Sequence, residues 1–172
     1  MEINHKIEID LLEFSKSGKF DVVKTGQTRD WILNNFPNPD DFEDGVSWRK
    51  GEFEIFTYGD FELHFSNDIL YLIFADFIGK INEGKSLSFT NKWIFEKETS
   101  EISLTYVMDE LSKKKIAYST KRNDELFSIA LRTNENVEMH FESDESTNPS
   151  GYFFSAISVM DKSIFNKKER PL

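Results

Sequence analysis

The sequence predicts an α+β fold in which two tandem helix–β-meander repeats form one antiparallel sheet with the helices packed on one face. A helix-start pattern followed by three strand-like runs occurs twice, in the same order. The helix patterns lie 75 residues apart, from Trp31 to Tyr106, and the middle strands lie 76 apart, from Phe61 to Val137. Because one such unit buries little surface alone, two units are expected to join their sheets edge to edge in a single domain spanning 1–172.

Two helices are expected before the first strands. Residues 4–17 carry apolar side chains near helical spacing, and Gly18 follows where a helix C-terminal glycine would lie. The second helix is expected to begin after Thr28, whose hydroxyl can accept from a backbone N–H one turn later. Pro37 ends that helix and opens a polar loop that reaches Gly45.

Three strand-like runs follow at 53–58, 61–65 and 69–77, with short polar links that favour antiparallel hairpins. In the middle run apolar and polar residues alternate, which is typical of a half-buried strand. This alternation predicts the side chains of the helix-covered core, which are Phe53, Ile55, Phe61, Leu63, Phe65, Leu70, Leu72 and Phe74. The aromatic residues predicted on the opposite, open face of the sheet are Phe56, Tyr58 and Tyr71.

The second repeat is expected to begin with a helix capped by Ser103 and to continue with three strands, at 127–131, 137–141 and 153–161. The predicted parts of the chain are repeat one at about 20–78, a less regular connector at 79–100, repeat two at about 101–161, and a basic tail at 162–172. The tail is polar as well as basic, so it is expected to be disordered or lightly docked.

The first half carries Gly26-x-Thr28 entering a helix, then Pro37, then the run Tyr58-Gly59-Asp60-Phe61-x-Leu63-x-Phe65 and a further strand. This pattern resembles the repeat of β-lactamase-inhibitor-protein-like domains, which small outer-membrane assembly lipoproteins also use. The resemblance covers about 55 residues of the first half and, more weakly, about 60 of the second. It implies a tandem-repeat sheet whose concave face grips another protein. The chain departs from both groups because it has no cysteine for a lipid anchor or a disulfide.

The chain has 31 acidic and 21 basic side chains and a formal net charge of −10. Phosphates would repel such a chain, so we expect a basic protein partner rather than nucleic acid or an anionic membrane. The absence of cysteine excludes thiol chemistry and disulfide scaffolds. We expect a cytoplasmic location, because the N-terminus lacks a signal-peptide pattern and no apolar run could cross a bilayer. Small acidic chains of this kind are similar to the immunity proteins of bacterial toxin systems.

Charged and aromatic side chains define the expected partner-binding surface. The acidic loop after Pro37 would attract a basic partner, and Phe42 within it would serve as an apolar anchor. The loop does not suit an EF-hand, because Phe42 occupies a ligand position. Tyrosines of the open sheet face would add contacts, with two histidines behind them. The expected partner-binding residues are Asp40, Asp41, Phe42, Glu43, Asp44, Tyr58, Tyr71, His64 and His140.

His64 and His140 occupy equivalent strand positions, each two residues after a glutamate, Glu62 or Glu138. Two histidines with carboxylates could bind zinc, so a small-molecule or metal-binding domain stays open as an alternative. A duplicated strand explains the same pattern without a metal. We therefore expect no cofactor and no metal site.

We expect a protein-binding module and not an enzyme, because no set of residues converges on a reaction. The most specific expectation is an immunity-type inhibitor that occludes the active site of a basic toxin domain. Its acidic loop would steer the partner, and aromatic side chains of the sheet would then be buried. A homodimer that joins two copies through the open sheet face is the second alternative.

Overall fold

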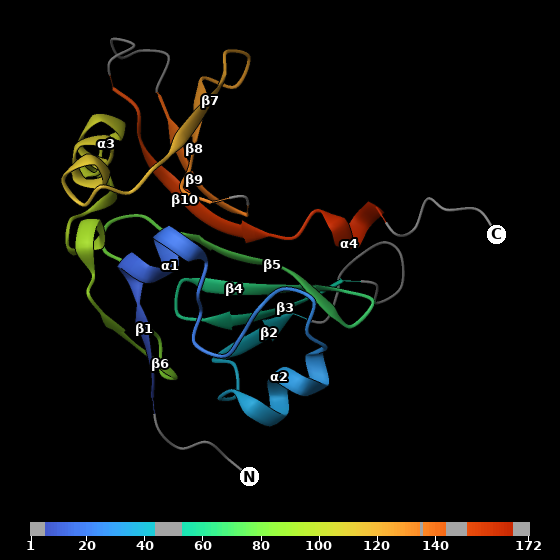
Figure 1. The fold of residues 1–172 in the computed structure, drawn as a ribbon. Coiled ribbons are helices and arrows are strands. Elements are labelled where there is room, and N and C mark those ends of the chain that lie inside the picture. The colour runs from blue at the N-terminus through green and yellow to red at the C-terminus, as the bar shows by residue number, and fades with distance from the viewer. Residues whose placement is uncertain (1–5, 44–52, 135, 144–150, 167–172) are drawn as a thin grey trace.

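The computed structural model describes residues 6–43, 53–134, 136–143 and 151–166 (Figure 1). Within them the chain has an α+β fold built on a large antiparallel sheet, so the predicted α+β class and the predicted antiparallel sheet are confirmed. The helices are α1 (Leu11–Ser17), α2 (Arg29–Asn35), α3 (Leu104–Lys113) and α4 (Ser163–Asn166), with 3₁₀ turns η1 (Trp93–Glu96) and η2 (Thr99–Glu101). The strands are β1 (Ile7–Asp10), β2 (Asp41–Glu43), β3 (Phe53–Tyr58), β4 (Phe61–Ser66), β5 (Ile69–Asp76), β6 (Leu87–Thr90), β7 (Ser119–Asn123), β8 (Ser128–Arg132), β9 (Val137–Glu142) and β10 (Phe153–Met160).

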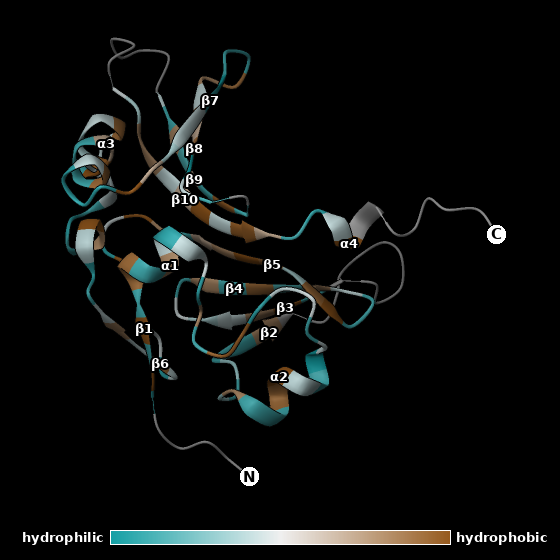
Figure 2. Cartoon of the chain, viewed as in Figure 1, coloured by the Kyte–Doolittle hydropathy of each residue, from teal (hydrophilic) through white to brown (hydrophobic). Residues whose placement is uncertain are grey.

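The large sheet has, among the described strands, the order β2-β3-β4-β5-β10-β9-β8-β7, and each neighbouring pair is antiparallel. β5 and β10 therefore form its centre, where Phe74 pairs with Ser158. Figure 2 shows apolar residues concentrated in these two strands and in β4, whereas β7 is largely hydrophilic. The most hydrophobic strands thus lie away from the edges of the sheet.

One face of the sheet packs against α1, α2 and α3. The ring centroid of Phe61 in β4 lies 5.2 Å from that of Phe14 in α1, and Tyr58 in β3 lies 5.3 Å from Phe36 after α2. Val107 of α3 belongs to the same buried cluster. We call the opposite face the open face and define it by one residue from each strand, namely Asp41, Thr57, Glu62, Phe74, Ser158, Glu138, Arg132 and Ser119.

The predicted orientation of β3 is wrong. Phe56 pairs with Leu63 and Tyr58 pairs with Phe61, so both aromatic rings lie in the core, with exposed fractions of 4% and 0%. A shift of one residue in a strand exchanges its two faces. β3 reads Phe-Glu-Ile-Phe-Thr-Tyr, so each of its two faces would carry apolar side chains. Its pairing with β4 decides which of these faces lies against the core.

A bulge changes the orientation of β5 as well. The register shifts between His64 and Phe65, and Tyr71 is the extra residue in β5. Leu72 and Phe74, expected in the core, therefore lie on the open face and are half-buried. The core positions of this strand are held by other side chains, Leu70, Ile73 and Ala75.

The helix expected at 4–17 is wrong in its first half, where β1 pairs in parallel with β6. β6 lies inside the segment expected to be an irregular connector. Asp10 then caps α1, because its Oδ1 accepts a hydrogen bond from the Glu13 N–H at 2.8 Å. Gly18 follows α1 with a φ of 76°, so the predicted end of this helix is confirmed.

The helices expected after Thr28 and Ser103 and the six expected strands are present. The edge strands β2 and β7 were not expected. In the basic tail the structure has α4, and residues 167–172 lie outside the described residues. None of the helices in the described ranges is long and apolar enough to cross a membrane.

Candidate functional site

Asp40 binds the chain's own backbone. Its Oδ2 accepts hydrogen bonds from the N–H groups of Gly59 at 2.9 Å and Lys85 at 3.0 Å, and its Oδ1 accepts from the Ser86 hydroxyl at 3.0 Å. Gly84 leaves room for this carboxylate, because a Cβ at that position would collide with it. Asp40 was expected to be an exposed acidic contact, and the structure instead uses it to fasten the start of β2 to the segment before β6.

Strand β2 separates the residues that were expected to act together. Asp41 pairs with Thr57 and lies on the open face, whereas Phe42 pairs with Phe56 and lies on the helix-covered side. Phe42 is nevertheless 58% exposed, because β2 is an edge strand. Glu43 ends β2, and Asp44 lies outside the described residues.

Phe42 lines a groove of about 450 Å³ between α2 and β2, which lie side by side in Figure 1. We call it the α2–β2 groove, and it is lined by Arg29, Asp30, Leu33, Asn38, Pro39, Phe42, Glu54 and Phe56. Leu33 of α2 is 41% exposed across the groove from Phe42. Sequence analysis did not single out Leu33. The available signal was that Leu33 directly follows Ile32, so that when Ile32 faces the core its neighbour Leu33 turns toward the surface of the helix.

The rim of the α2–β2 groove carries a net negative charge. Arg29 forms ion pairs with Glu54 and, at 2.9 Å, with Asp68. Asp30 is exposed on the first turn of α2 and adds a third carboxylate near this single guanidinium. An apolar groove with such a rim suits an apolar side chain flanked by basic residues.

The two tyrosines expected on the open face have different environments. Tyr58 is buried, its hydroxyl donates to the carbonyl of Pro37 at 2.8 Å, and burial raises its pKa. Its predicted place on the open face is wrong, so it cannot contact a partner there. Tyr71 is half-buried at the bulge, its ring centroid lies 6.2 Å from that of His64, and burial raises its pKa too.

His64 and His140 both lie on the open face beside the expected glutamates. Nε2 of His64 is 2.7 Å from a carboxylate oxygen of Glu62, and Nε2 of His140 is 3.8 Å from one of Glu138. Strands β5 and β10 separate the two pairs, which places them about 14 Å apart at the usual strand spacing. That separation is too large for the two imidazoles to share one metal ion.

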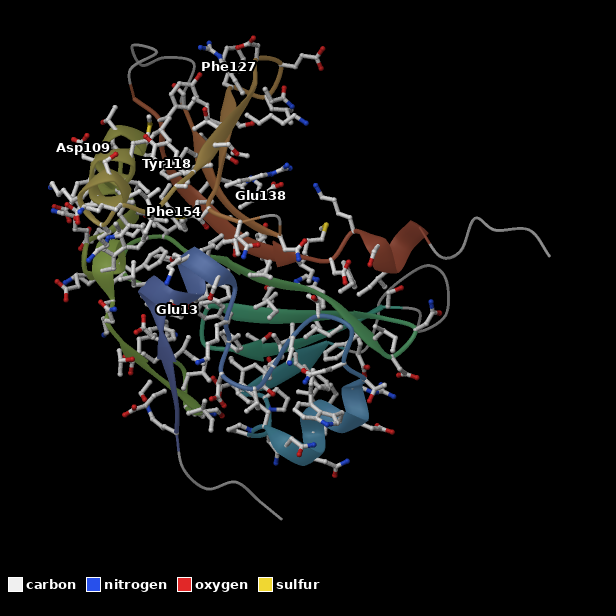
Figure 3. The ribbon with its side chains drawn as sticks, viewed as in Figure 1. Glu13, Asp109, Tyr118, Phe127, Glu138 and Phe154 are labelled. Carbon is white, nitrogen blue, oxygen red and sulfur yellow. The ribbon has the colours of Figure 1, made fainter. Side chains whose placement is uncertain are left out.

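Among the described carboxylates of the open face, Glu138 has the most charged partners. Its partners are Arg132 and, at 3.6 Å, Nζ of Lys162. Burial raises the pKa of Glu138, but the hydrogen bond from Arg132 and the nearby positive charges outweigh this effect and lower it. At His140, by contrast, burial favours the neutral imidazole and lowers the pKa. Figure 3 shows Glu138 on the side of the sheet away from α3, with Phe154 on the α3 side.

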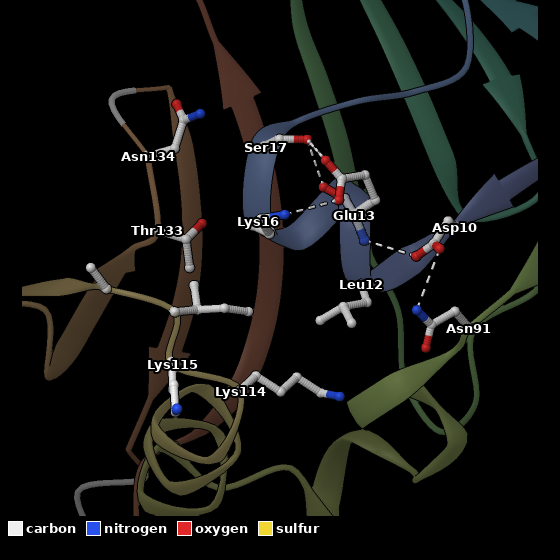
Figure 4. A pocket seen from close by; sticks show the side chains of 12 residues that line it. Asp10, Leu12, Glu13, Lys16, Ser17, Asn91, Lys114, Lys115, Thr133 and Asn134 are labelled. Atoms are coloured by element: carbon white, nitrogen blue, oxygen red, sulfur yellow. Dashed lines mark hydrogen bonds and ion pairs between the residues drawn. The ribbon is translucent and has the colours of Figure 1, made fainter.

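A cleft of about 700 Å³ lies between α1, the end of α3 and the β8–β9 turn (Figure 4). Its two carboxylates bind neighbouring groups: Asp10 accepts from Asn91, and Glu13 accepts from Ser17. Its lysines lie on exposed surface, so nothing in the cleft fixes the position of a ligand. Within the described part of the chain, no three side chains of the kinds that bind metals converge.

No family model, curated protein or solved structure matches this chain. The likeness to β-lactamase-inhibitor-protein-like domains and to immunity proteins therefore depends on the sequence features alone.

Proposed function

We propose that this chain is a protein-binding module that holds an apolar side chain of a basic protein segment in the α2–β2 groove. The observation that carries this proposal is the exposure of Phe42 and Leu33, 58% and 41%, on the two walls of one groove. Burying a side chain such as that of Phe42 contributes about 1.5–3 kcal/mol. Two such residues beside each other can therefore anchor a partner.

Charge supports a basic partner. The groove is lined by one guanidinium, of Arg29, and two carboxylates, of Asp30 and Glu54, and a third carboxylate, of Asp68, pairs with the same guanidinium. The whole chain carries a net charge of −10. Charges of this kind raise the rate of association more than they raise affinity, since they guide the approach of an oppositely charged protein.

We further propose that the partner is a toxin domain and that the chain is its immunity-type inhibitor in the cytoplasm. An inhibitor that occludes an active site needs a complementary surface and no catalytic group of its own. The acidic, cysteine-free composition and the resemblance to inhibitor-type repeats support this role.

We also propose that the fold consists of two tandem copies of one helix–β-meander unit. Corresponding residues make corresponding hydrogen bonds in the two halves. The N–H after the first helix cap, of Arg29, donates to the carbonyl of Asp68 at 2.9 Å, and that of Leu104 donates to Tyr152 at 2.9 Å. Both acceptors precede a central strand, β5 or β10, so the two units would meet at the middle of the sheet.

The test is co-expression with the product of the adjacent gene, scored by growth and by co-purification. We expect that product to be toxic alone and to be rescued and bound by this chain. The double variant Phe42→Ser/Leu33→Ser should lose at least about tenfold in affinity and fail to rescue. Leu126→Ser is the matched control, because Leu126 is 70% exposed at the β7–β8 turn, outside the groove.

A harmless neighbour that does not co-purify would overturn the inhibitor proposal, and full binding by the double variant would overturn the groove as its site. Charge is tested separately with Asp30→Lys, which should slow association and weaken its salt dependence. Asp109→Lys, a similarly exposed change on α3, should leave the association rate unaltered.

A further inference from the structure

The strand registers align one residue from every strand in a row across the open face. From β2 to β7 the row is Asp41, Thr57, Glu62, Phe74, Ser158, Glu138, Arg132 and Ser119. Its midpoint lies between Phe74 and Ser158, the pair that joins β5 to β10. The row divides the open face into two halves, β2 to β5 and β7 to β10, whose charges can be compared.

Charge is divided unequally along this face. The half formed by β2 to β5 carries carboxylates and no lysine or arginine in its described open-face positions, and the carboxylates among its described side chains are Asp41, Glu62 and Asp76. The half formed by β7 to β10, with Lys162, has three cations, Lys121, Arg132 and Lys162, against Glu138 and Glu142. One half is thus negative and the other is slightly positive, in a chain with a large negative charge.

The same imbalance appears in the local contacts. Glu138 binds both Arg132 and Lys162, so this cluster has one cation more than it has carboxylates. Glu62 bonds the imidazole of His64, and no lysine or arginine of the described ranges forms an ion pair with it. Each half therefore lacks the charge that the other half has in excess.

Apolar side chains lie between the two charged halves. Leu72 and Phe74 of β5 and Met160 of β10 are half-buried on the open face, and Leu72 pairs with Met160 across the central strands. Apolar side chains at the centre with charges at the rim are the usual composition of a protein interface.

We propose that a second copy of this chain packs on the open face, related by a two-fold axis that runs parallel to the strands over the β5–β10 pair. This axis reverses the row, so the positive half of each copy faces the negative half of the other. Ser158 of one copy then lies over Phe74 of the other. Arg132 lies over Thr57, between Asp41 and Glu62, and Glu138, whose charge is offset by Arg132 and Lys162, lies over Glu62.

The size of the face is sufficient for such a contact. At about 4.8 Å per strand, eight strands span roughly 38 Å, and strands of six residues run about 20 Å. The face therefore has an area of roughly 760 Å², close to the ~800 Å² that each partner buries in an interface of standard size. Two twisted sheets that pack face to face keep their mean strand directions within about 30° of each other, and an axis along the strands satisfies this condition.

A copy of the chain suits this face better than a uniformly charged partner. A basic protein would be repelled by Lys121, Arg132 and Lys162, and an acidic one by the other half. Only a partner with both signs in reverse order satisfies the whole face, and the chain itself has that arrangement. This surface is separate from the α2–β2 groove, so the proposal does not depend on the function proposed above.

The experiment measures the mass of the intact chain by light scattering and sedimentation, from low micromolar to near-millimolar concentration. We expect twice the 20.1 kDa of one chain at the higher concentrations. Glu62→Lys and Arg132→Glu should each raise the dimer dissociation constant by at least about tenfold. An equimolar mixture of the two variants should form a heterodimer of near wild-type affinity, because one Glu62–Arg132 contact is kept and the other is reversed.

Asp109→Lys on α3 is the control for a change of charge and should leave the dimer intact. Lys162→Glu, at a side chain that is 65% exposed, takes the place of Arg132→Glu if that variant does not fold. A wild-type chain that stays monomeric at every concentration would overturn the proposal. So would single variants that dimerise normally, or a mixture that remains monomeric.

Discussion

Thr28 at the start of α2 and Ser103 at the start of α3 cap their helices with the same geometry. Their φ and ψ angles are −79° and 153° for Thr28 and −79° and 155° for Ser103, and each hydroxyl accepts an N–H three residues later at 3.2 Å. Each cap residue also pairs with the first residue of a central strand, Ile69 or Phe153. The two caps thus fix both the start of a helix and its attachment to the sheet.

Thr28→Ala and Ser103→Ala should each lower the free energy of unfolding by about 1 kcal/mol, since each leaves a helix N–H without its acceptor. The two caps belong to different helices, α2 and α3, so the double variant should lose the sum of both. Urea unfolding followed by circular dichroism measures these values. A cap substitution without any cost would contradict the assigned hydrogen bond.

Asp40→Ala should lower the free energy of unfolding by about 2–4 kcal/mol, because three donors lose a charged acceptor. Asp41→Ala is the matched control. Within the described residues its carboxylate accepts from the N–H of Phe42, at 2.8 Å on an exposed edge, and its loss should cost less than about 1 kcal/mol. Equal losses in chemical denaturation would show that Asp40 has no special structural role.

Gly84→Ala should destabilise the fold far more than Gly26→Ala, although both residues have a positive φ, of 65° and 92°. A Cβ at position 84 would meet the carboxylate of Asp40 and the backbone of Gly59, whereas a Cβ at position 26 meets nothing within 4 Å. We expect Gly26→Ala to cost about 1 kcal/mol, from backbone strain alone. Comparison of the two melting curves tests this, and similar curves would exclude the close packing at Gly84.

His140→Gln should reduce the loss of stability in mild acid. Burial lowers the pKa of His140 below its usual 6.5, and the charges of Glu138 and Glu142 oppose this shift. The unfolded chain therefore takes up a proton at a pH where the folded chain does not. The stability that comes from keeping His140 uncharged is complete above about pH 6.5. It is lost as the pH falls from there through the lowered pKa of the folded chain. Between about pH 8 and about pH 5, wild type should lose more free energy of unfolding than the variant does. An identical decline in both would contradict the shift.

The helices and the inner strands could be predicted because single residues mark them. Thr28 and Ser103 are strong caps, Pro37 stops a helix, and the alternation in β4 has one apolar phase. β3 could not be oriented from its own residues, since Ile55 and Phe56 are both apolar. Only the pairing of Phe56 with Leu63, set by the neighbouring strand, resolves the choice.

The candidate site was predicted only in part. Phe42 could be identified as an exposed aromatic in an acidic loop, and its exposure agrees with that expectation. The role of Asp40 could not be foreseen, because its donors come from Gly59 and from residues 85–86, far along the chain. β7 gave no signal either, since its Ser-Thr-Lys-Arg-Asn run has no apolar residue and depends on β8 for its pairing.

The pairing of β5 with β10 has a consequence for synthesis of the chain. β5 reads Ile-Leu-Tyr-Leu-Ile-Phe-Ala-Asp, and on one side β10 is its only neighbour in the sheet. The 76 residues from 77 to 152 must be translated before β10 begins, which takes roughly 4–15 s at about 5–20 residues per second. During that interval a nascent chain that has already formed its first hairpins carries a bare apolar edge, the kind of edge that pairs with other chains. Slower translation of these 76 residues would lengthen the time during which this edge can pair with another chain.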